Sequence, residues 1–343
     1  MKSIIHSSKH TPWYEWVMLI VLAFVCIIVG LNFLYGTGFH FLLDKDFVDS
    51  YGSLLGGLGG LCGIYYLYKT LRNQNEAQQL SSFETRYIQL ISFNRSLLHD
   101  MHIGTESDNL HGTECFQLFV HVLKEAYNVV DEIISKQSIN ELYKDADTYN
   151  KDLNLWDSVE NLKKRTIINI SYLITFIGVK KLSLNQLKFI LNKTYKEDIV
   201  NNVISTFQVY IIDQDNGDIC NMNPVVLNCL RNNENKKYRG FQNEFGNYFR
   251  LLFQIFRYLN EQTWLSNQDK YTYAKMLRSQ LSNYEELLLF YNSLSDYGLE
   301  WEYNKVQNDD KLITKFKLIK NIPFDQDLAK LFYPNINFEN GGN

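Results

Sequence analysis

The sequence predicts an all-α protein, with an N-terminal two-helix transmembrane hairpin followed by a helical cytoplasmic domain. Only four of its 343 residues are proline, so long uninterrupted helices are permitted. Apolar side chains recur at three- and four-residue steps through much of the chain, which is the spacing of one helix face. Two uncharged stretches near the N-terminus have the length of membrane spans.

The first uncharged stretch, residues 16–35, follows a short N-terminal segment of residues 1–15. Its 20 residues contain no charge and only Asn32 as a strongly polar side chain, which predicts transmembrane helix 1. A cleaved signal peptide is the alternative. We favour the span because the apolar run exceeds the usual signal-peptide core and no small-residue cleavage site follows it.

The second uncharged stretch, residues 50–68, predicts transmembrane helix 2 and is rich in glycine. Glycines at four-residue intervals leave a smooth face that another helix backbone can approach closely. They are Gly52, Gly56 and Gly60 in one row, and Gly59 and Gly63 in another. We expect this face to pack against the first span, and a homo-oligomeric contact is the alternative.

The flanking charges predict the orientation of the hairpin. Lys2 and Lys9 precede the first span, and Lys69 and Arg72 follow the second, whereas the intervening residues 36–49 carry three aspartates and one lysine. Because positive charges stay on the cytoplasmic side, both termini are expected in the cytoplasm and residues 36–49 form an external loop.

Residues 69–101 contain neither glycine nor proline and predict a juxtamembrane helix that leaves the membrane without a break. Apolar residues and one asparagine form a heptad-like face, which we expect to pack on the cytoplasmic core, with a parallel dimer seam as the alternative. The face consists of Leu80, Phe83, Tyr87, Leu90, Asn94, Leu97 and Met101.

Residues 102–239 form the predicted helical cytoplasmic region. A loop is expected at 102–114, followed by helices near 114–135, 155–179, 184–191 and 199–210. The apolar part of 155–179 has only about 14 uncharged residues, too few for a third span, so a buried core helix is predicted. An acidic stretch near 213–218 lacks the spacing of a calcium loop and predicts a plain turn.

Residues 240–298 predict three helices, and residues 299–343 form a C-terminal segment. Ser266 with Asp269, and Ser282 with Glu285, have the spacing of helix-capping pairs. In the C-terminal segment, lysines interleave with apolar residues between 311 and 320, which predicts a core element with a solvated lysine face, with an element lying against anionic lipid as the alternative.

Polar residues on these three helices are the candidate binding or structural cluster. We expect arginines from two of the helices to meet Glu285, either as a lock for the bundle or as a binding site for a partner molecule or a small anionic signal. The candidates are Tyr248, Arg250, Arg257, Arg278, Gln280, Glu285 and Asn292.

The run from Gly240 to Glu261, with the later run from Tyr273 to Ser295, resembles the C-terminal signature of the putative phage abortive-infection protein family, typified by lactococcal AbiC. The resemblance is carried by Tyr248-Phe249-Arg250, the run 278–282, Glu285 and Tyr291-Asn292, and weakly by Phe83-Glu84. It implies a membrane-anchored bacterial defence protein with a mostly helical cytoplasmic part. Some members carry histidines near the positions of Phe241 and Asn247, which this chain lacks.

No catalytic constellation is recognised in the sequence, so an enzyme is not the favoured interpretation. The five cysteines show no paired motif, and neither a metal site, a disulfide framework nor a cofactor is expected. Arg95 and His102 have the spacing used by helical HEPN-class ribonucleases, in which an arginine steadies the phosphate and a histidine moves a proton. We favour a structural role for both residues. The net charge of −4 gives no reason to expect nucleic acid as a partner.

The function expected from these observations is membrane-anchored anti-phage defence by abortive infection, with the helical domain as sensor or effector. The expected partners are the lipid bilayer, a second copy of the chain, and a phage component or infection signal. The alternatives are a membrane-tethered ribonuclease using Arg95 and His102, and a membrane scaffold without a defence role.

Overall fold

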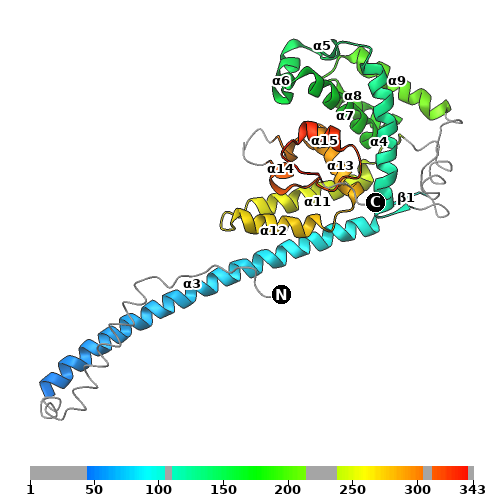
Figure 1. Ribbon diagram of the computed structural model, residues 1–343. Coiled ribbons are helices and arrows are strands. Elements are labelled where there is room, and N and C mark those ends of the chain that lie inside the picture. Colours follow the sequence, from blue (N-terminus) through cyan, green and yellow to red (C-terminus); the bar gives the residue numbers. More distant parts are fainter. Residues whose placement is uncertain (1–44, 105–109, 214–237, 304–310, 339–343) are drawn as a thin grey trace. The chain divides into compact units, whose positions relative to one another are not determined.

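The computed structural model describes residues 45–104, 110–213, 238–303 and 311–338 (Figure 1). These residues are mostly helical, which confirms the predicted all-α class. The chain divides into two compact units, Met1–Phe83 and Glu84–Asn343.

The described part of the first unit is helical and belongs to α3, Lys45–Asp100, a single helix that continues into the second unit. The predicted span 16–35 lies outside the described residues. The predicted span 50–68 lies within α3, where a Cβ atom built on Gly56, Gly60 or Gly63 would meet nothing within 4 Å. Of the helices in the described ranges, none combines the length and apolarity that crossing a membrane requires.

The second unit begins with the C-terminal part of α3 and a short antiparallel hairpin. Strand β1, His102–Ile103, pairs with β2, Leu110–His111, so the predicted loop at 102–114 contains a small β element. Tyr87 and Asn94 on the predicted face of α3 are buried, and so is Met101, directly after the helix. The Tyr87 hydroxyl donates to the Tyr273 carbonyl at 3.0 Å. The face therefore packs on the helical core, as we expected in preference to a dimer seam.

Six helices follow along the chain. They are α4 Thr113–Ile134, α5 Ile139–Leu142, α6 Ala146–Trp156, α7 Val159–Ile177, α8 Lys181–Leu191 and α9 Glu197–Asp213. The predicted continuous helix at 155–179 is wrong. Asp157 adopts a left-handed conformation that ends α6, and the Ser158 side chain caps α7 by accepting from the Asn161 amide.

The core of the second unit is built on α7, which packs along α4, while α13 packs against both. All residues of α7 from Arg165 to Ile177 are buried, which confirms the prediction of a core helix. Aromatic rings fill the space between helices. Phe245 of α11 lies edge-on to Phe116 and Phe119 of α4, with ring centroids 4.8 and 5.0 Å apart.

The last part of the unit contains α11 Gln242–Asn260, α12 Asn267–Arg278, α13 Asn283–Leu294, the 3₁₀ helix η2 Leu299–Trp301, α14 Leu312–Phe316 and α15 Gln326–Phe332. The three helices predicted for 240–298 and both capping pairs are confirmed. Ser266 accepts from the Asp269 amide, and Ser282 with Glu285 forms a complete capping box. Leu312, Ile313 and Phe316 of α14 are buried, so this lysine-rich segment is a core element.

Two glycines join α7 to the start of α11. Gly178 and Gly240 both have positive φ, and a Cβ on Gly240 would lie 2.1 Å from the Ile177 carbonyl oxygen. The Phe241 amide donates to the Phe176 carbonyl at 2.8 Å across this junction. Only glycine permits both the backbone conformation and the close approach, and the junction fixes α11 beside α7.

Candidate functional site

Glu285, at the first turn of α13, is the centre of a buried polar cluster. Its side chain is 1% exposed. One carboxylate oxygen accepts from the Ser282 amide at 2.7 Å, and the Glu285 amide donates to the Ser282 hydroxyl at 3.2 Å. This carboxylate thus satisfies the helix N-terminus while its other oxygen remains for partners from other helices.

Those partners come from α3 and α11. Arg95 Nη1 lies 3.2 Å from Glu285 Oε1 and donates to the Gln280 carbonyl at 3.0 Å. The buried Tyr248 hydroxyl donates to the same Oε1. Burial, together with the nearby negative charge of Glu285, raises the pKa of Tyr248 well above its ordinary value. Three helices are therefore tied together at one carboxylate.

The arginine partner of Glu285 differs from the one expected from the sequence. Arg278 Nη1 donates instead to the carbonyls of Phe316 and Lys317, at 3.2 and 2.9 Å. Arg250 and Arg257 also bond elsewhere, as described below for the cleft that they line. Gln280 contributes its backbone carbonyl to the cluster. The expectation that arginines of the set Arg250, Arg257 and Arg278 meet Glu285 is thus corrected to a meeting with Arg95.

Arg95 and His102, the ribonuclease candidates, have separate surroundings. Arg95 binds Glu285 and Gln280, whereas the His102 Nδ1 atom lies 3.0 Å from the Asp100 carbonyl oxygen. The His102 ring is exposed and lies 6.5 Å from the His111 ring, between centroids. In the ranges that the structure describes, no hydrogen bond joins Arg95 to His102. The ribonuclease alternative stays a prediction.

A second buried cluster, around Arg165 of α7, was not singled out from the sequence. Arg165 is 2% exposed, forms an ion pair with Asp296, and donates from Nε to the Leu294 carbonyl at 3.1 Å. Asn169 donates to the other Asp296 oxygen at 3.0 Å and accepts from the Asp296 amide at 2.8 Å. The available signal was the i,i+4 pair of Arg165 and Asn169, which places two polar side chains on a helix whose later turns are apolar.

Electrostatics in this second cluster favour the charged arginine. Burial disfavours the charge, but the carboxylates of Asp296 and Asp152 outweigh that effect and raise the pKa of Arg165. The neighbouring Tyr195 has its pKa raised to about 12, chiefly by burial. The cluster fastens α13 to α7 through groups that are mutually satisfied.

Asn292 of α13 holds a third connection in the core. Its amide nitrogen donates to the Tyr172 hydroxyl at 2.7 Å, and its side-chain oxygen accepts from the Trp301 indole at 3.1 Å. Gly298 passes so close that a Cβ atom would lie 2.1 Å from the Asn292 carbonyl oxygen. Both the nitrogen and the oxygen of the Asn292 side-chain amide, a predicted site residue, therefore form hydrogen bonds within the core.

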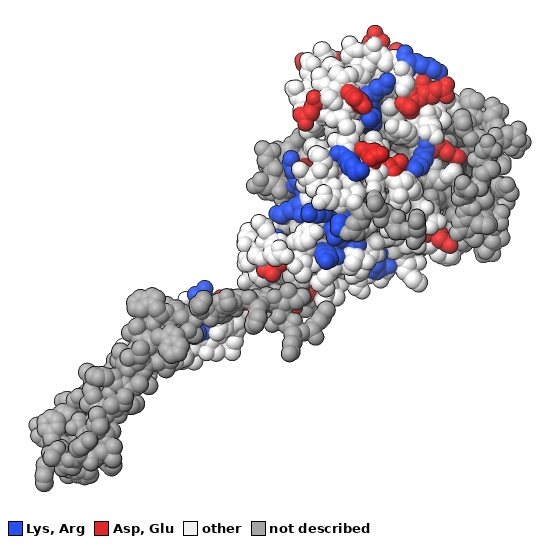
Figure 2. All heavy atoms as spheres, viewed as in Figure 1, with Lys and Arg blue, Asp and Glu red and all other residues white. Residues whose placement is uncertain are grey.

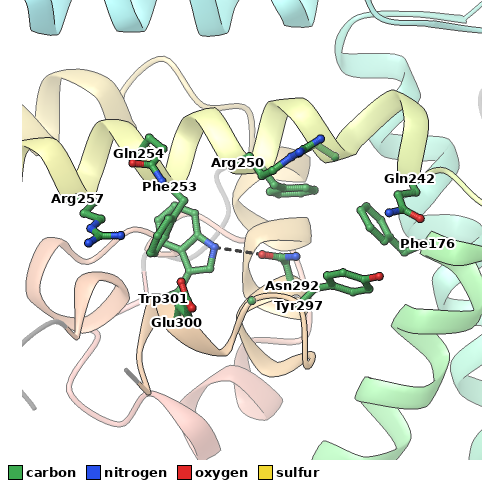
Figure 3. A pocket seen from close by; sticks show the side chains of 13 residues that line it. Phe176, Gln242, Arg250, Phe253, Gln254, Arg257, Asn292, Tyr297, Glu300 and Trp301 are labelled. Carbon is green, nitrogen blue, oxygen red and sulfur yellow. Dashed lines mark hydrogen bonds between the residues drawn. The ribbon is translucent and has the colours of Figure 1, made fainter. Parts of the chain in front are cut away.

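A cleft of about 370 Å³ opens between α11, the end of α13 and η2 (Figure 3). Two of the predicted site arginines, Arg250 and Arg257, line it together with Asn292. Arg250 donates to the Gly246 carbonyl and the Asn247 side chain, at 3.1 and 2.7 Å. Arg257 pairs with Glu261 of the same helix at 2.8 Å, and both of these side chains are about half exposed. This cleft is where the candidate residues meet an open space.

A basic surface lies near α12 and α14, where Figure 2 shows lysine and arginine side chains gathered. The pKa of Tyr271 is lowered by this positive charge. Burial acts to raise its pKa, but the hydrogen bond from Arg278 and the charges of Arg278, Lys317 and Lys320 lower it.

Within the described ranges, no group of three His, Cys, Asp or Glu side chains is arranged to hold a metal ion.

These features define a class: a mostly helical domain that buried ion pairs hold together, with an open cleft lined by arginine and aromatic side chains. Residues 240–327 match the model of a family described as putative phage abortive infection protein. The resemblance carried by the signature helices is thereby confirmed for this segment, which runs from the start of α11 into α15. No curated protein and no solved structure gave a significant match.

Proposed function

We propose that this protein acts in bacterial defence against phages by abortive infection. The observation that carries the proposal is the family match over residues 240–327. That segment contains the Glu285 cluster partner Tyr248, the Asn292 connection and most of the cleft. The match thus covers the part of the domain in which the candidate binding groups lie.

The proposal includes a membrane anchor made of the two uncharged stretches, 16–35 and 50–68. Their charge distribution supports a hairpin with both termini in the cytoplasm. In the first unit, Leu61, Ile64 and Leu67 of α3 are exposed, and the glycine face of α3 is open. Exposed apolar side chains beside open glycines suit a lipid or helix partner better than water.

Membrane anchoring is tested by fractionating cells that express the full chain and washing the membranes with alkaline carbonate. An integral hairpin keeps the protein in the membrane pellet, whereas release into the wash would contradict the anchor. Alkaline phosphatase fused within residues 36–49 is expected to be active, because that loop is predicted to lie outside the cytoplasm.

Within this proposal the helical domain is the sensor or effector, and infection changes its ligand state or its assembly. The glycine face is expected to pack against the first span, and a second copy of the chain is the alternative partner for it. Crosslinking before and after infection tests this part, and a protein that stays monomeric in both states would exclude the oligomeric version.

The defence role is tested by plaque formation of a phage panel on bacteria with and without the protein. Fewer plaques together with death of infected cells is the expected result. A matched strain expressing the chain with a stop codon before residue 240 controls for the burden of expression. Equal plaque numbers for every phage, at confirmed protein levels, would contradict the role.

A further inference from the structure

The cleft beside α11 has the size and lining of a small-molecule site. In Figure 3, side chains of α11 form one wall, and Trp301 and Glu300 of η2 with Tyr297 form the other. Its volume of about 370 Å³ is within the range of pockets that hold small ligands. All of its lining residues belong to the second unit.

Positive charge is available on the α11 wall. Arg250 and Arg257 are seven residues apart, so they lie on the same helix face about 10 Å apart along the axis. Within the described residues, the Arg250 guanidinium donates to a carbonyl and an amide oxygen and forms no ion pair with a carboxylate. The exposed pair between Arg257 and Glu261 contributes little stability and is readily exchanged for an anionic ligand.

Aromatic surface is available beside that charge. Phe253 is half-buried and meets the Trp301 ring edge-on, with centroids 5.0 Å apart. Tyr297 is 42% exposed at the rim, and Phe176 lies at the far end in Figure 3. Exposed ring surface next to arginines suits a ligand that has both a planar ring and an anionic group.

Gly246 keeps part of the cleft wall open. A Cβ atom there would meet Arg250, Gln242 and Phe176 at 3.8, 3.9 and 4.0 Å, which are ordinary contacts. Alanine would therefore fit, and it would favour the helix by about 1 kcal/mol over glycine. Packing within the chain does not require this glycine, and its missing side chain widens the space between Arg250 and Phe176.

We propose that this cleft binds a nucleotide. Arg250 and Arg257, whose guanidinium groups now contact Asn247 and Glu261, turn from these partners to hold the phosphate, and the base lies against Phe253 and Tyr297. A guanidinium group forms paired, charge-assisted hydrogen bonds to phosphate oxygens. Glu300, at the cleft edge, accepts hydrogen bonds from ribose hydroxyls. The inference rests on the proposed function only in assigning the nucleotide the role of an infection signal.

The test is calorimetric titration of the purified full chain with the four ribonucleoside monophosphates. Adenosine and inorganic phosphate are the comparison probes, since one lacks the phosphate and the other lacks the ring. We expect at least one monophosphate to bind and both comparison probes to bind at least about tenfold more weakly, because each supplies only half of the contacts. Absence of binding by all four monophosphates would overturn the proposal.

Variants identify the site. Arg250→Gln and Arg257→Gln are each expected to weaken binding at least about tenfold, the loss of one charge-assisted contact. Gly246→Ala is expected to weaken binding while leaving the thermal midpoint unchanged or higher. Arg72→Gln is the matched control for Arg257→Gln, because Arg72 forms the same i,i+4 pair with Glu76 outside the cleft. Unchanged binding in both Arg250→Gln and Gly246→Ala would overturn the assignment.

The same variants in the plaque assay separate this proposal from the defence role. Nucleotide binding by a protein that protects against no phage would contradict the defence role and leave the cleft assignment standing. Protection by a protein that binds no monophosphate would contradict the cleft assignment and leave the defence role standing.

Discussion

Arg165 and Arg250 belong to the same helical domain and have opposite surroundings. Arg165 is 2% exposed, and its guanidinium is shared among Asp296, Asp152 and the Leu294 carbonyl. Arg250 is exposed at the cleft and bonds a carbonyl and an amide oxygen of its own helix. One arginine has its hydrogen bonds committed to the fold, and the other keeps its charge available.

Because of this difference, mutation of Arg165 and mutation of Arg250 are expected to impair function for different reasons. A buried charge that loses its partners destabilises the fold, so loss of function follows from loss of folding. An exposed arginine at a cleft can be removed at little cost in stability, so loss of function there indicates a ligand. Measuring unfolding and function on the same variants distinguishes the two.

The largest expected effect is that of Arg165→Met. Removing the guanidinium leaves Asp296 and Asp152 without their positive partner, and breaking such a buried pair costs about 3 to 5 kcal/mol. Urea unfolding followed by tryptophan fluorescence measures this loss, because Trp156 lies against Arg165, with 5.6 Å between the guanidinium carbon and the ring centroid.

The control for this prediction is the double variant Arg165→Met with Asp296→Asn. It removes the stranded charge and is expected to recover part of the lost stability. A loss below about 1 kcal/mol in the single variant would show that the cluster does not lock α13 to α7.

Next in size is Tyr248→Phe, which removes one hydrogen-bond donor from the buried Glu285 carboxylate. Hydrogen bonds to charged groups contribute about 1.5 to 3 kcal/mol, and we expect a loss of that size in urea unfolding. The same substitution made in a Glu285→Gln background is expected to cost less, since glutamine keeps the capping box but carries no charge. An equal cost in both backgrounds would contradict the proposed coupling.

A smaller effect concerns alkaline pH. The pKa of Tyr195 is raised from 10.0 to about 12 in the folded state. Its contribution to stability is fully present below the unfolded pKa and is lost as pH rises from 10 toward 12. At pH 11 the loss is about 1 to 2 kcal/mol. Tyr195→Phe should therefore make the fall of unfolding free energy between pH 10 and 11 shallower.

The comparison for this alkaline effect is Tyr271→Phe. Because the pKa of Tyr271 is lowered, its ionised form is favoured in the folded state, and removing it should not make the alkaline fall shallower. A shallower fall in Tyr271→Phe than in Tyr195→Phe would reverse the expected order.

The smallest effect on folding is expected for Arg250→Gln, within about 0.5 kcal/mol of the unchanged chain, because the side chain is exposed and bonds only its own helix. Thermal unfolding of the purified chain measures it. A loss above about 1 kcal/mol would place Arg250 with the locking residues and remove the contrast with Arg165.

The helices of residues 240–298 were predictable because their signals are local. Phe245, Phe249, Leu252 and Phe256 repeat at helical spacing. Ser266 and Ser282 are helix N-caps, and each accepts a hydrogen bond from the amide three residues further on. The break between α6 and α7 was missed because the apolar pattern continues across Asp157, where a left-handed residue ends one helix without glycine or proline.

The sequence predicted several residues of the candidate site, but it did not predict which of them contact one another. Tyr248 and Glu285 were singled out and do meet, whereas Arg250 and Arg257 line the cleft, and Arg278 binds the end of α14. Arg165 and Asp296 were missed, because a charged residue beside an apolar run is usually exposed to solvent. Only the structure shows that this part of α7 is buried.

The sequence by itself determined the helical class, the positions of the signature helices and the caps that begin them, since each depends on residues within one or two turns. Only the tertiary structure decided which charges meet. Arg95 reaches Glu285 across 190 residues, and Arg165 reaches Asp296 across 131. Contacts over such distances follow from how helices pack, and no local pattern of residues encodes the angle and register of that packing.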